Sequence, residues 1–263
     1  MNTNCANKFV RVKNTIMKRF ICILLAAMLL PIISWAKVPD DDDILRKIID
    51  RSSPYYYSTL MTRYRNLEQL NEEEYHYLYY GYAFHENYKP LNPCKALDDL
   101  FGLMAIIDTE RPDKKDIEQI IIACNRAMEF DPFNPTVLNF LTYAYGNSGD
   151  TEKEQAYFRH MNGILETIKS SGDGRGEKFP MHIIMFSHAT DLVASLGVEH
   201  RKAQIVSRKV EFIPLVQPRR VPDGKIKGFY FDYSRIYRNK PDDVTFQKKR
   251  TWQFNNLGVR EYK

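Results

Sequence analysis

The chain has 263 residues, 44% of them hydrophobic, which is enough for a packed core and excludes a wholly disordered chain. Its formal charge of +5 comes from residues 1 to 36, which contain five Lys and Arg residues and no acid. The remaining 33 basic and 33 acidic residues cancel. Because phosphate binding requires a net basic footprint, nucleic acid is not an expected partner.

The charge of this neutral remainder is unevenly distributed. Residues 201 to 263 hold sixteen Lys and Arg against six Asp and Glu, a local charge of +10, and residues 37 to 200 carry the compensating −10. We expect the two parts to attract each other within one fold. A basic docking face for an acidic partner is the alternative.

The N-terminal 36 residues have the pattern of a signal peptide. A Lys-Arg pair precedes an almost wholly apolar run from Phe20 to Ile33, and Ser34-Trp-Ala36 places small residues at the two positions that a signal peptidase reads. The run is shorter than the ~20 residues that span a bilayer and contains a proline, which disfavours an uncleaved anchor. Cleavage after Ala36 predicts a periplasmic or secreted protein that begins at Lys37 and has no transmembrane span.

Two cysteines remain after this cleavage, Cys94 and Cys124. In an exported protein they can form a disulfide, but Cys124 lies on the apolar face of a predicted helix and is equally consistent with a small core residue. The sequence has no CxxC pair and no metal-type spacing, so it predicts neither a metal nor a cofactor.

Residues 37 to 107 are predicted to form a series of helices. The acidic run at 40–43 favours the start of the first through the helix dipole, and apolar residues spaced by three and four mark the second between residues 56 and 67. Asn71 and the three glutamates that follow it cap the next helix. A further helix is expected over residues 96 to 107.

The helix after Asn71 is aromatic or apolar on nearly every side, with the run Tyr75-His-Tyr-Leu-Tyr-Tyr-Gly-Tyr-Ala-Phe84. A helix of this composition is expected to be buried on several sides, at the centre of the first helical layer. The alternative is that some of its tyrosines, among them Tyr79 and Tyr82, form a stacking platform for sugar rings or a peptide.

Three helices are predicted between Asp116 and Ser170, and an Asp-Pro-x-Asn-Pro run ending at Pro135 separates the first two. This stretch resembles the tetratricopeptide repeat, a helical hairpin of about 34 residues that stacks on its neighbours. Thr142 and Glu154 stand where that repeat has small residues. We therefore expect helical hairpins without a regular superhelical groove.

The stretch Ser170-Ser-Gly-Asp-Gly-Arg-Gly-Glu177 forms a glycine-rich loop. A phosphate cradle would need a strand before the loop and a Lys-Ser or Lys-Thr pair after it, and a calcium loop would need alternating acids. Neither pattern is present, so a flexible connector is predicted. Residues Met181 to Leu196 are predicted to form the last helix, which ends at Gly197.

The C-terminal segment changes to strand patterns. Residues 204–216 are β-branched, Val221-Pro-Asp-Gly224 is a turn, residues 226–237 alternate with a period of two, and residues 244–254 form a basic, aromatic run. We expect a small antiparallel sheet of two or three strands that needs helices to cover one face. The residues predicted to face the helices are Phe229, Phe231 and Tyr233.

Three features occur in a fixed order: the Tyr-Leu-Tyr-Tyr-Gly-Tyr-Ala-Phe84 helix, the Ser-Gly-Asp-Gly174 loop and the Tyr-Phe-Asp232 strand. Together they resemble a family of uncharacterised exported Bacteroidetes proteins, domain of unknown function family 4919, over roughly residues 45 to 240. The resemblance implies export and a helical-repeat-like body, and it supplies no catalytic residue.

The expected fold is mainly α (α+β), with a signal peptide (1–36), a tetratricopeptide-like helical-hairpin region (37–199) and a basic β-rich segment (200–263) packed on the helices. The six histidines show no HxH or HExxH pairing, and no nucleophile elbow or cysteine-protease signature is present. The sequence favours a non-catalytic binding or scaffold module for an envelope protein, peptide or glycan. A hydrolase-type enzyme whose site leaves no motif is the alternative. The candidate binding surface comprises Tyr79, Tyr82, Tyr145, Arg219, Arg220 and Arg235.

Overall fold

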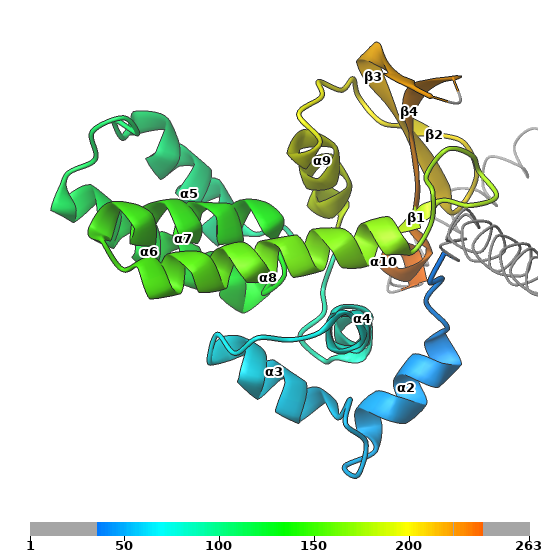
Figure 1. Ribbon diagram of the computed structural model, residues 1–263, viewed down its shortest axis with the longest axis horizontal. Coiled ribbons are helices and arrows are strands. Elements are labelled where there is room, and N and C mark those ends of the chain that lie inside the picture. The colour runs from blue at the N-terminus through cyan, green and yellow to red at the C-terminus, as the bar shows by residue number, and fades with distance from the viewer. Residues whose placement is uncertain (1–35, 223, 239–263) are drawn as a thin grey trace, which may run out of the picture. The chain divides into compact units, whose positions relative to one another are not determined.

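The computed structural model describes residues 36–222 and 224–238 (Figure 1). The predicted signal peptide, apart from Ala36, and the predicted strand at 244–254 lie outside the described residues. The described part is mainly α, with a small sheet at its C-terminal end, as the sequence predicts. No helix in the described ranges combines the length and the apolar composition that a membrane crossing requires.

The helices and strands follow one another along the chain with helices first. Their bounds are α2 (Asp41–Ile49), α3 (Tyr57–Arg65), α4 (Glu72–Gly81), the 3-10 helix η1 (Tyr82–Phe84), α5 (Lys95–Ile106), α6 (Lys114–Phe130), α7 (Pro135–Ser148), α8 (Thr151–Ser170), β1 (Met181–His182), α9 (Phe186–Ser195), β2 (Gln204–Ile205), β3 (Val210–Val221), β4 (Gly224–Asp232) and α10 (Ser234–Arg238).

Side-chain caps determine where several of these helices begin. The side chain of Asp40 accepts hydrogen bonds from two backbone amides at the start of α2. Asn71 and Glu74 form a reciprocal capping box at the start of α4, which confirms the predicted cap. Helix α7 shows how a helix ends: Gly149 follows its last residue with a φ of 82°, the left-handed conformation that commonly terminates a helix.

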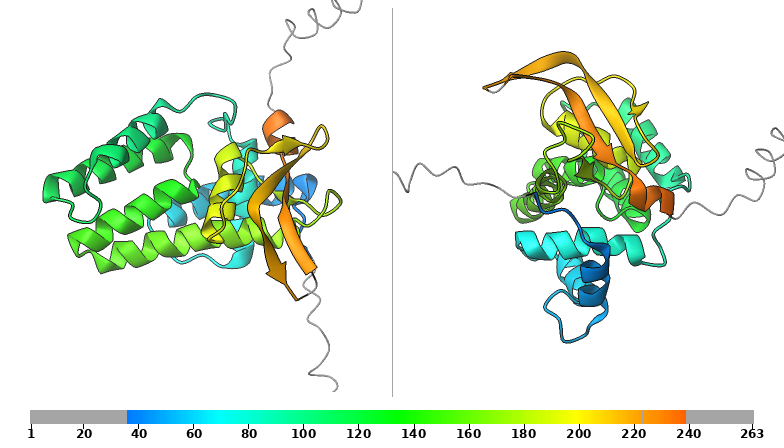
Figure 2. Two further views of the ribbon diagram at one scale, coloured as in Figure 1. Left: turned by 90° about the horizontal axis from the view of Figure 1, so that it is seen from above. Right: turned by 90° about the vertical axis from the view of Figure 1, so that its right-hand side faces the viewer.

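Helices α5 to α8 pack in chain order, each against the next (Figures 1 and 2). They share a small hydrophobic core that includes Leu100, Ile120, Cys124 and Leu141. Cys124 is fully buried, and burial raises the pKa of its thiol to about 12. Cys94 and Cys124 are both free, so Cys124 is a small core residue and no disulfide joins the two.

The larger core surrounds α4. Tyr75, Tyr77, Tyr79, Tyr80 and Tyr82 are all buried, which confirms that the aromatic run packs at the centre of the molecule. The stacking-platform alternative does not fit these side chains, because none of them is more than 6% exposed and a ligand could not stack on their rings. Most of their hydroxyl groups instead donate hydrogen bonds to groups inside the protein, for example from Tyr80 to the carbonyl of His182 (3.0 Å).

The sheet has four strands in the order β1-β4-β3-β2. Strands β3 and β4 form the predicted hairpin, and β2 is antiparallel to β3, but β1 is parallel to β4 through Met181↔Phe231 and His182↔Asp232. The sheet is therefore mixed, and the helix predicted to start at Met181 starts at Phe186 instead. A short apolar run fits both a buried strand and a buried helix turn, so its periodicity could not separate the two.

One face of β4 is covered by the helices. Phe229, Phe231 and Tyr233 have exposed fractions of 7%, 0% and 2%, which confirms the predicted covered face. Tyr230 and Asp232 alternate with them and are half-buried. The covered residues belong to the same core as the α4 tyrosines, so the sheet and the helices are packed together.

The glycine-rich loop is anchored, contrary to the expectation of a flexible connector. The amide of Gly174 donates to the carbonyl of Phe179 (2.9 Å), and its carbonyl accepts from the amide of Tyr230 on β4 (2.8 Å). A Cβ at Gly172 would collide with the carbonyl of Pro180. The glycines therefore allow a close backbone approach between the loop, the segment after it and the sheet.

Candidate functional site

A cleft of about 580 Å³ lies beside the edge of the sheet at which β1 pairs with β4. Its walls come from three separate segments: the first described residues, at 36 and 38, the glycine-rich loop with the residues that follow it, and the bend at 207–209 together with the first residue of β3. His182 and Asp232, which are register partners on β1 and β4, also line it. The volume is within the range of ligand-binding pockets.

The polar groups near His182 are held by hydrogen bonds. The backbone amide of His182 donates to Ser171 Oγ (2.7 Å), and that hydroxyl donates to the carbonyl of Ile168 (2.6 Å). Asp232 Oδ1 accepts from the amide of Ser234 (2.8 Å) at the start of α10. The hydroxyl and the carboxylate of the cleft are thus both engaged in positioning the backbone.

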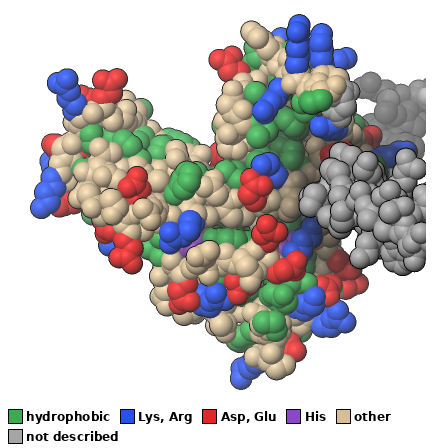
Figure 3. All heavy atoms as spheres, in the orientation of Figure 1, with side chains coloured by type: hydrophobic (Ala, Val, Ile, Leu, Met, Phe, Trp, Pro, Cys, Tyr) green, Lys and Arg blue, Asp and Glu red, His purple; other side chains and the backbone are tan. Residues whose placement is uncertain are grey.

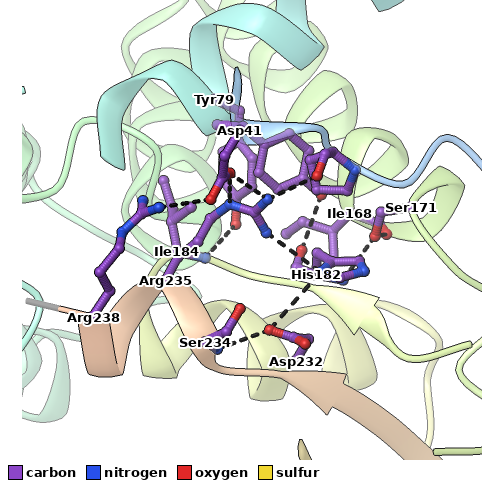
Figure 4. Close-up of polar contacts among 12 residues, drawn as sticks. Asp41, Tyr79, Ile168, Ser171, His182, Ile184, Asp232, Ser234, Arg235 and Arg238 are labelled. Atoms are coloured by element: carbon purple, nitrogen blue, oxygen red, sulfur yellow. Dashed lines mark hydrogen bonds and ion pairs between the residues drawn. The ribbon is translucent and has the colours of Figure 1, made fainter. Parts of the chain in front are cut away.

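Arg235 supports the cleft from within the protein (Figure 4). Its guanidinium donates to Asp41 Oδ1 through Nε (3.0 Å) and Nη2 (2.7 Å), to the carbonyl of Pro39 (2.9 Å) and to His182 Nδ1 (3.3 Å). It also lies over the ring of Tyr80, 5.1 Å from the centroid. Arg235 therefore connects three parts of the chain: α10, on which it lies, the start of α2 with the residues just before it, and β1.

Arg238 donates from α10 to the same carboxylate, at Asp41 Oδ2 (2.6 Å). Burial raises the pKa of Asp41, but the charges and hydrogen bonds of Arg235 and Arg238 outweigh burial and lower it overall. Asp41 is therefore an anion between two cations. These ion pairs directly connect the acidic start of the helical region with the basic C-terminal segment.

His182 is neutral in this setting. Burial lowers the pKa of its imidazole to about 4, and the positive charge of Arg235 acts in the same direction. The negative charge of Asp232 opposes this shift but does not cancel it. Because Nδ1 accepts from Arg235, the ring proton is assigned to Nε2. Nδ1 lies 3.9 Å from Asp232 Oδ1, which is too far for a hydrogen bond, so the two do not form an oriented acid–base pair.

The rim of the cleft carries most of its charge. Lys178, Arg208 and Lys209 are exposed, and none of them has an ion-pair partner in residues 36–222 or 224–238. Glu177 is the acid on the same rim, so the rim is net basic. The exposed side chain of Phe179 adds an apolar surface. The arrangement is suited to hold an anionic group beside an apolar one.

A second polar cluster links a carboxylate, an imidazole and a hydroxyl in the order of a catalytic triad, but its side chains are buried and a substrate could not reach them. His188 Nε2 donates to Asp131 Oδ2 (2.9 Å), and the hydroxyl of Tyr79 donates to His188 Nδ1 (2.8 Å). The side chains of His188 and Tyr79 have no exposed surface, and that of Asp131 is 7% exposed. This cluster satisfies buried polar groups within the core.

The residues predicted as a binding surface do not come together. Tyr79, Tyr82 and Arg235 are buried, so their assignment to a surface is wrong. Tyr145 is half-buried on α7 and stacks on Tyr157 of α8 with ring centroids 5.4 Å apart. The remaining two are exposed on β3 outside the cleft, and they are Arg219 and Arg220.

Sequence reasoning did not find the residues that form the cleft. They are distributed over segments that are far apart in the chain, and no spacing pattern connects Lys178 with Arg208 and Lys209. The glycine-rich loop was the available signal, because several glycines in one loop indicate a close backbone approach.

Comparison with known proteins gives one family match. The model of a family described as "Domain of unknown function (DUF4919)" matches residues 42–241. No curated protein and no solved structure matches the chain significantly.

Proposed function

Because the chain belongs to the DUF4919 family of domains of unknown function, whose description names no reaction, we propose its function from the cleft. The protein is a non-catalytic, exported binding module that holds an anionic group of an envelope peptide, protein or glycan. The tetratricopeptide-like hairpins of α6, α7 and α8 are its scaffold.

The observation that carries this proposal is the division between the inner wall and the rim of the cleft. On the inner wall, the Ser171 hydroxyl and the Asp232 carboxylate each accept a hydrogen bond from a backbone amide. His182 Nδ1 accepts one from Arg235. A catalytic nucleophile needs a free base at hydrogen-bond distance, whereas a binding site needs free charges that desolvate on contact with a ligand. Lys178, Arg208 and Lys209 meet the second requirement.

Export is proposed on the leader sequence, and one backbone contact supports cleavage after Ala36. The amide of Lys37 donates to the carbonyl of Ser170 (2.7 Å), the last residue of α8. Cleavage would place a charged α-amino group at this carbonyl, where the dipole of a helix favours a cation. N-terminal sequencing of the purified protein is expected to begin at Lys37. Recovery of the intact leader on the purified protein would rule out this processing.

The binding function is tested by reversing the charge of the rim. The mature protein, immobilised, is incubated with envelope extract, and bound peptides, proteins and glycans are identified by mass spectrometry. Arg208→Glu combined with Lys209→Glu is expected to reduce the recovery of a specific partner by about tenfold, since each reversed charge adds repulsion to the lost attraction.

The matched control is Lys114→Glu combined with Lys115→Glu, which reverses two adjacent exposed lysines at the start of α6. This variant should retain the partner. Equal recovery by the cleft variant would contradict the assignment of the cleft. Recovery of a partner that the wild-type protein has cleaved would favour the hydrolase alternative.

A further inference from the structure

A second groove, of about 430 Å³, lies along the first half of β4. Side chains of β3 and β4, with Arg175 from the glycine-rich loop, line it. It shares no lining residue with the cleft described above. Whatever binds here can therefore be tested independently of the proposed function.

The strand beside this groove has an open edge. β1 pairs only with Phe231 and Asp232 of β4, and the glycine-rich loop adds one hydrogen bond at Tyr230. From Gly224 to Phe229, β3 is the only strand next to β4 among the described residues. An open edge presents backbone donors and acceptors to which an extended chain can pair.

An apolar wall stands at one end of the groove. The rings of Phe212 and Tyr230 lie 4.7 Å apart between centroids, and both side chains are half-buried. A Cβ at Gly228 would collide with the ring of Phe212, so the glycine allows this ring to lie close to β4. Ile226 and Val221 extend the wall. In a strand that pairs with β4, alternate side chains would meet this surface.

The charge of the groove selects the kind of strand that fits. Lys225 and Lys227 are exposed and have no ion-pair partner in the described part of the chain. None of the described residues that line the groove is acidic. Arg220, the register partner of Lys225, adds a further exposed cation. Figure 3 shows Lys and Arg side chains gathered over the β3–β4 hairpin. Edge lysines repel a second basic edge and attract an acidic one.

We propose that β4 binds an acidic, extended peptide segment of a partner protein as an added strand. Its carboxylates pair with Lys225 and Lys227, and an aromatic or large aliphatic side chain packs on Phe212 and Tyr230. An acidic sugar would use the cations and the rings but not the strand edge. The peptide is thus the ligand that accounts for all three features.

The probe for this site is a fluorescein-labelled peptide, Glu-Val-Glu-Tyr-Glu-Val-Glu, titrated against the mature protein and followed by fluorescence anisotropy. Two further peptides have the same sequence but carry N-methyl groups on alternate backbone amides. The first is methylated at the even-numbered residues and the second at the odd-numbered residues. Because only one edge of an added strand faces β4, one of the methylated peptides should lose binding by at least about tenfold and the other should bind like the parent.

Protein variants test the charge. Lys225→Glu combined with Lys227→Glu should weaken binding of the parent peptide by about tenfold, whereas the control Lys114→Glu with Lys115→Glu should bind normally. Circular dichroism would verify that both variants are folded. Equal binding of both methylated peptides, or of the peptide with Lys in place of Glu, would overturn the proposal. So would binding of an oligogalacturonate, sensitive to the same charge reversal, in the absence of peptide binding.

Discussion

Between pH 6.5 and about pH 4.5 the free energy of unfolding is expected to fall by about 6 kcal/mol, or about 2 kcal/mol for each of three histidines, His76, His160 and His182. Burial is the largest cause that lowers the pKa of His76, His160 and His182 from 6.5 to about 4. In the unfolded chain these imidazoles take up protons near pH 6.5. The unfolded state therefore binds more protons in this window, and the folded state loses stability as the pH falls.

The surroundings of each imidazole explain why the folded protein resists protonation. His160 lies between two partners: its Nε2 donates to the carbonyl of Tyr64 (3.0 Å), and its Nδ1 accepts from the hydroxyl of Tyr75 (2.7 Å). His76 Nδ1 is buried without a hydrogen-bond partner in the described residues. His182 Nδ1 accepts from the guanidinium of Arg235, which a protonated ring could not do.

Urea unfolding at a series of pH values tests this expectation. His160→Gln keeps a donor and an acceptor but removes one titrating group, so it should reduce the dependence of the unfolding free energy on pH by about a third. His200→Gln is the control, because His200 is exposed to solvent. An unfolding free energy that stays constant from pH 7 to about pH 4.5 would contradict the assignment of neutral buried histidines. Domains have a stability of roughly 5–15 kcal/mol. A loss of about 6 kcal/mol should therefore unfold much of the protein at about pH 4.5 even at low urea concentration.

The elements that could be predicted from sequence are those with a strong local pattern. The capping box at Asn71, the apolar spacing of α6 to α8 and the alternation around Phe231 each depend on residues that are close in the chain. Local hydrogen bonds and the burial of one face determine these features, so periodicity and caps are sufficient to find them. Strand β1 was missed because its partner lies fifty residues further along, at Phe231 and Asp232.

The candidate sites could not be predicted for a related reason. The composition of the Tyr-rich helix favours a core position but does not show which tyrosines could meet a ligand. Tyr79 is buried by His188 of α9 and by Phe133, which are both distant in the chain. Arg235 looks like an exposed cation in sequence, but its acidic partner, Asp41, lies almost two hundred residues away. Burial and long-range pairing, which decide the role of a polar side chain, leave no local pattern.

Replacing Arg235 with Met is expected to lower the free energy of unfolding by about 3 kcal/mol. The side chain of Arg235 is 5% exposed, and methionine retains most of its apolar stem while removing the guanidinium. The carbonyl of Pro39 and Nδ1 of His182 then lose a donor, and the ion pair with Asp41 is lost. Loss of one partner from a buried polar network usually costs more than the pair contributes, because the other groups remain desolvated.

Arg238→Met provides the matched control on the same helix. Arg238 contacts the other oxygen of Asp41, but its side chain is 41% exposed, so water replaces the lost contact and a cost below about 1 kcal/mol is expected. Combining each variant with Asp41→Asn gives two double-mutant cycles. The coupling energy of Arg235 with Asp41 should exceed that of Arg238 with Asp41 by at least about 1 kcal/mol.

Hydrogen exchange locates the effect of Arg235. The guanidinium joins α10 to the segment before α2, so Arg235→Met should accelerate exchange in both segments while the amides of α6 and α7, which lie in a separate core, keep their protection. Equal costs for Arg235→Met and Arg238→Met, with unchanged exchange of the amides of Asp40 to Asp43, would show that the C-terminal helix is held by apolar packing alone. Because Arg235 is buried and Arg238 is exposed to solvent, salt should reduce the cost of Arg235→Met much less than that of Arg238→Met.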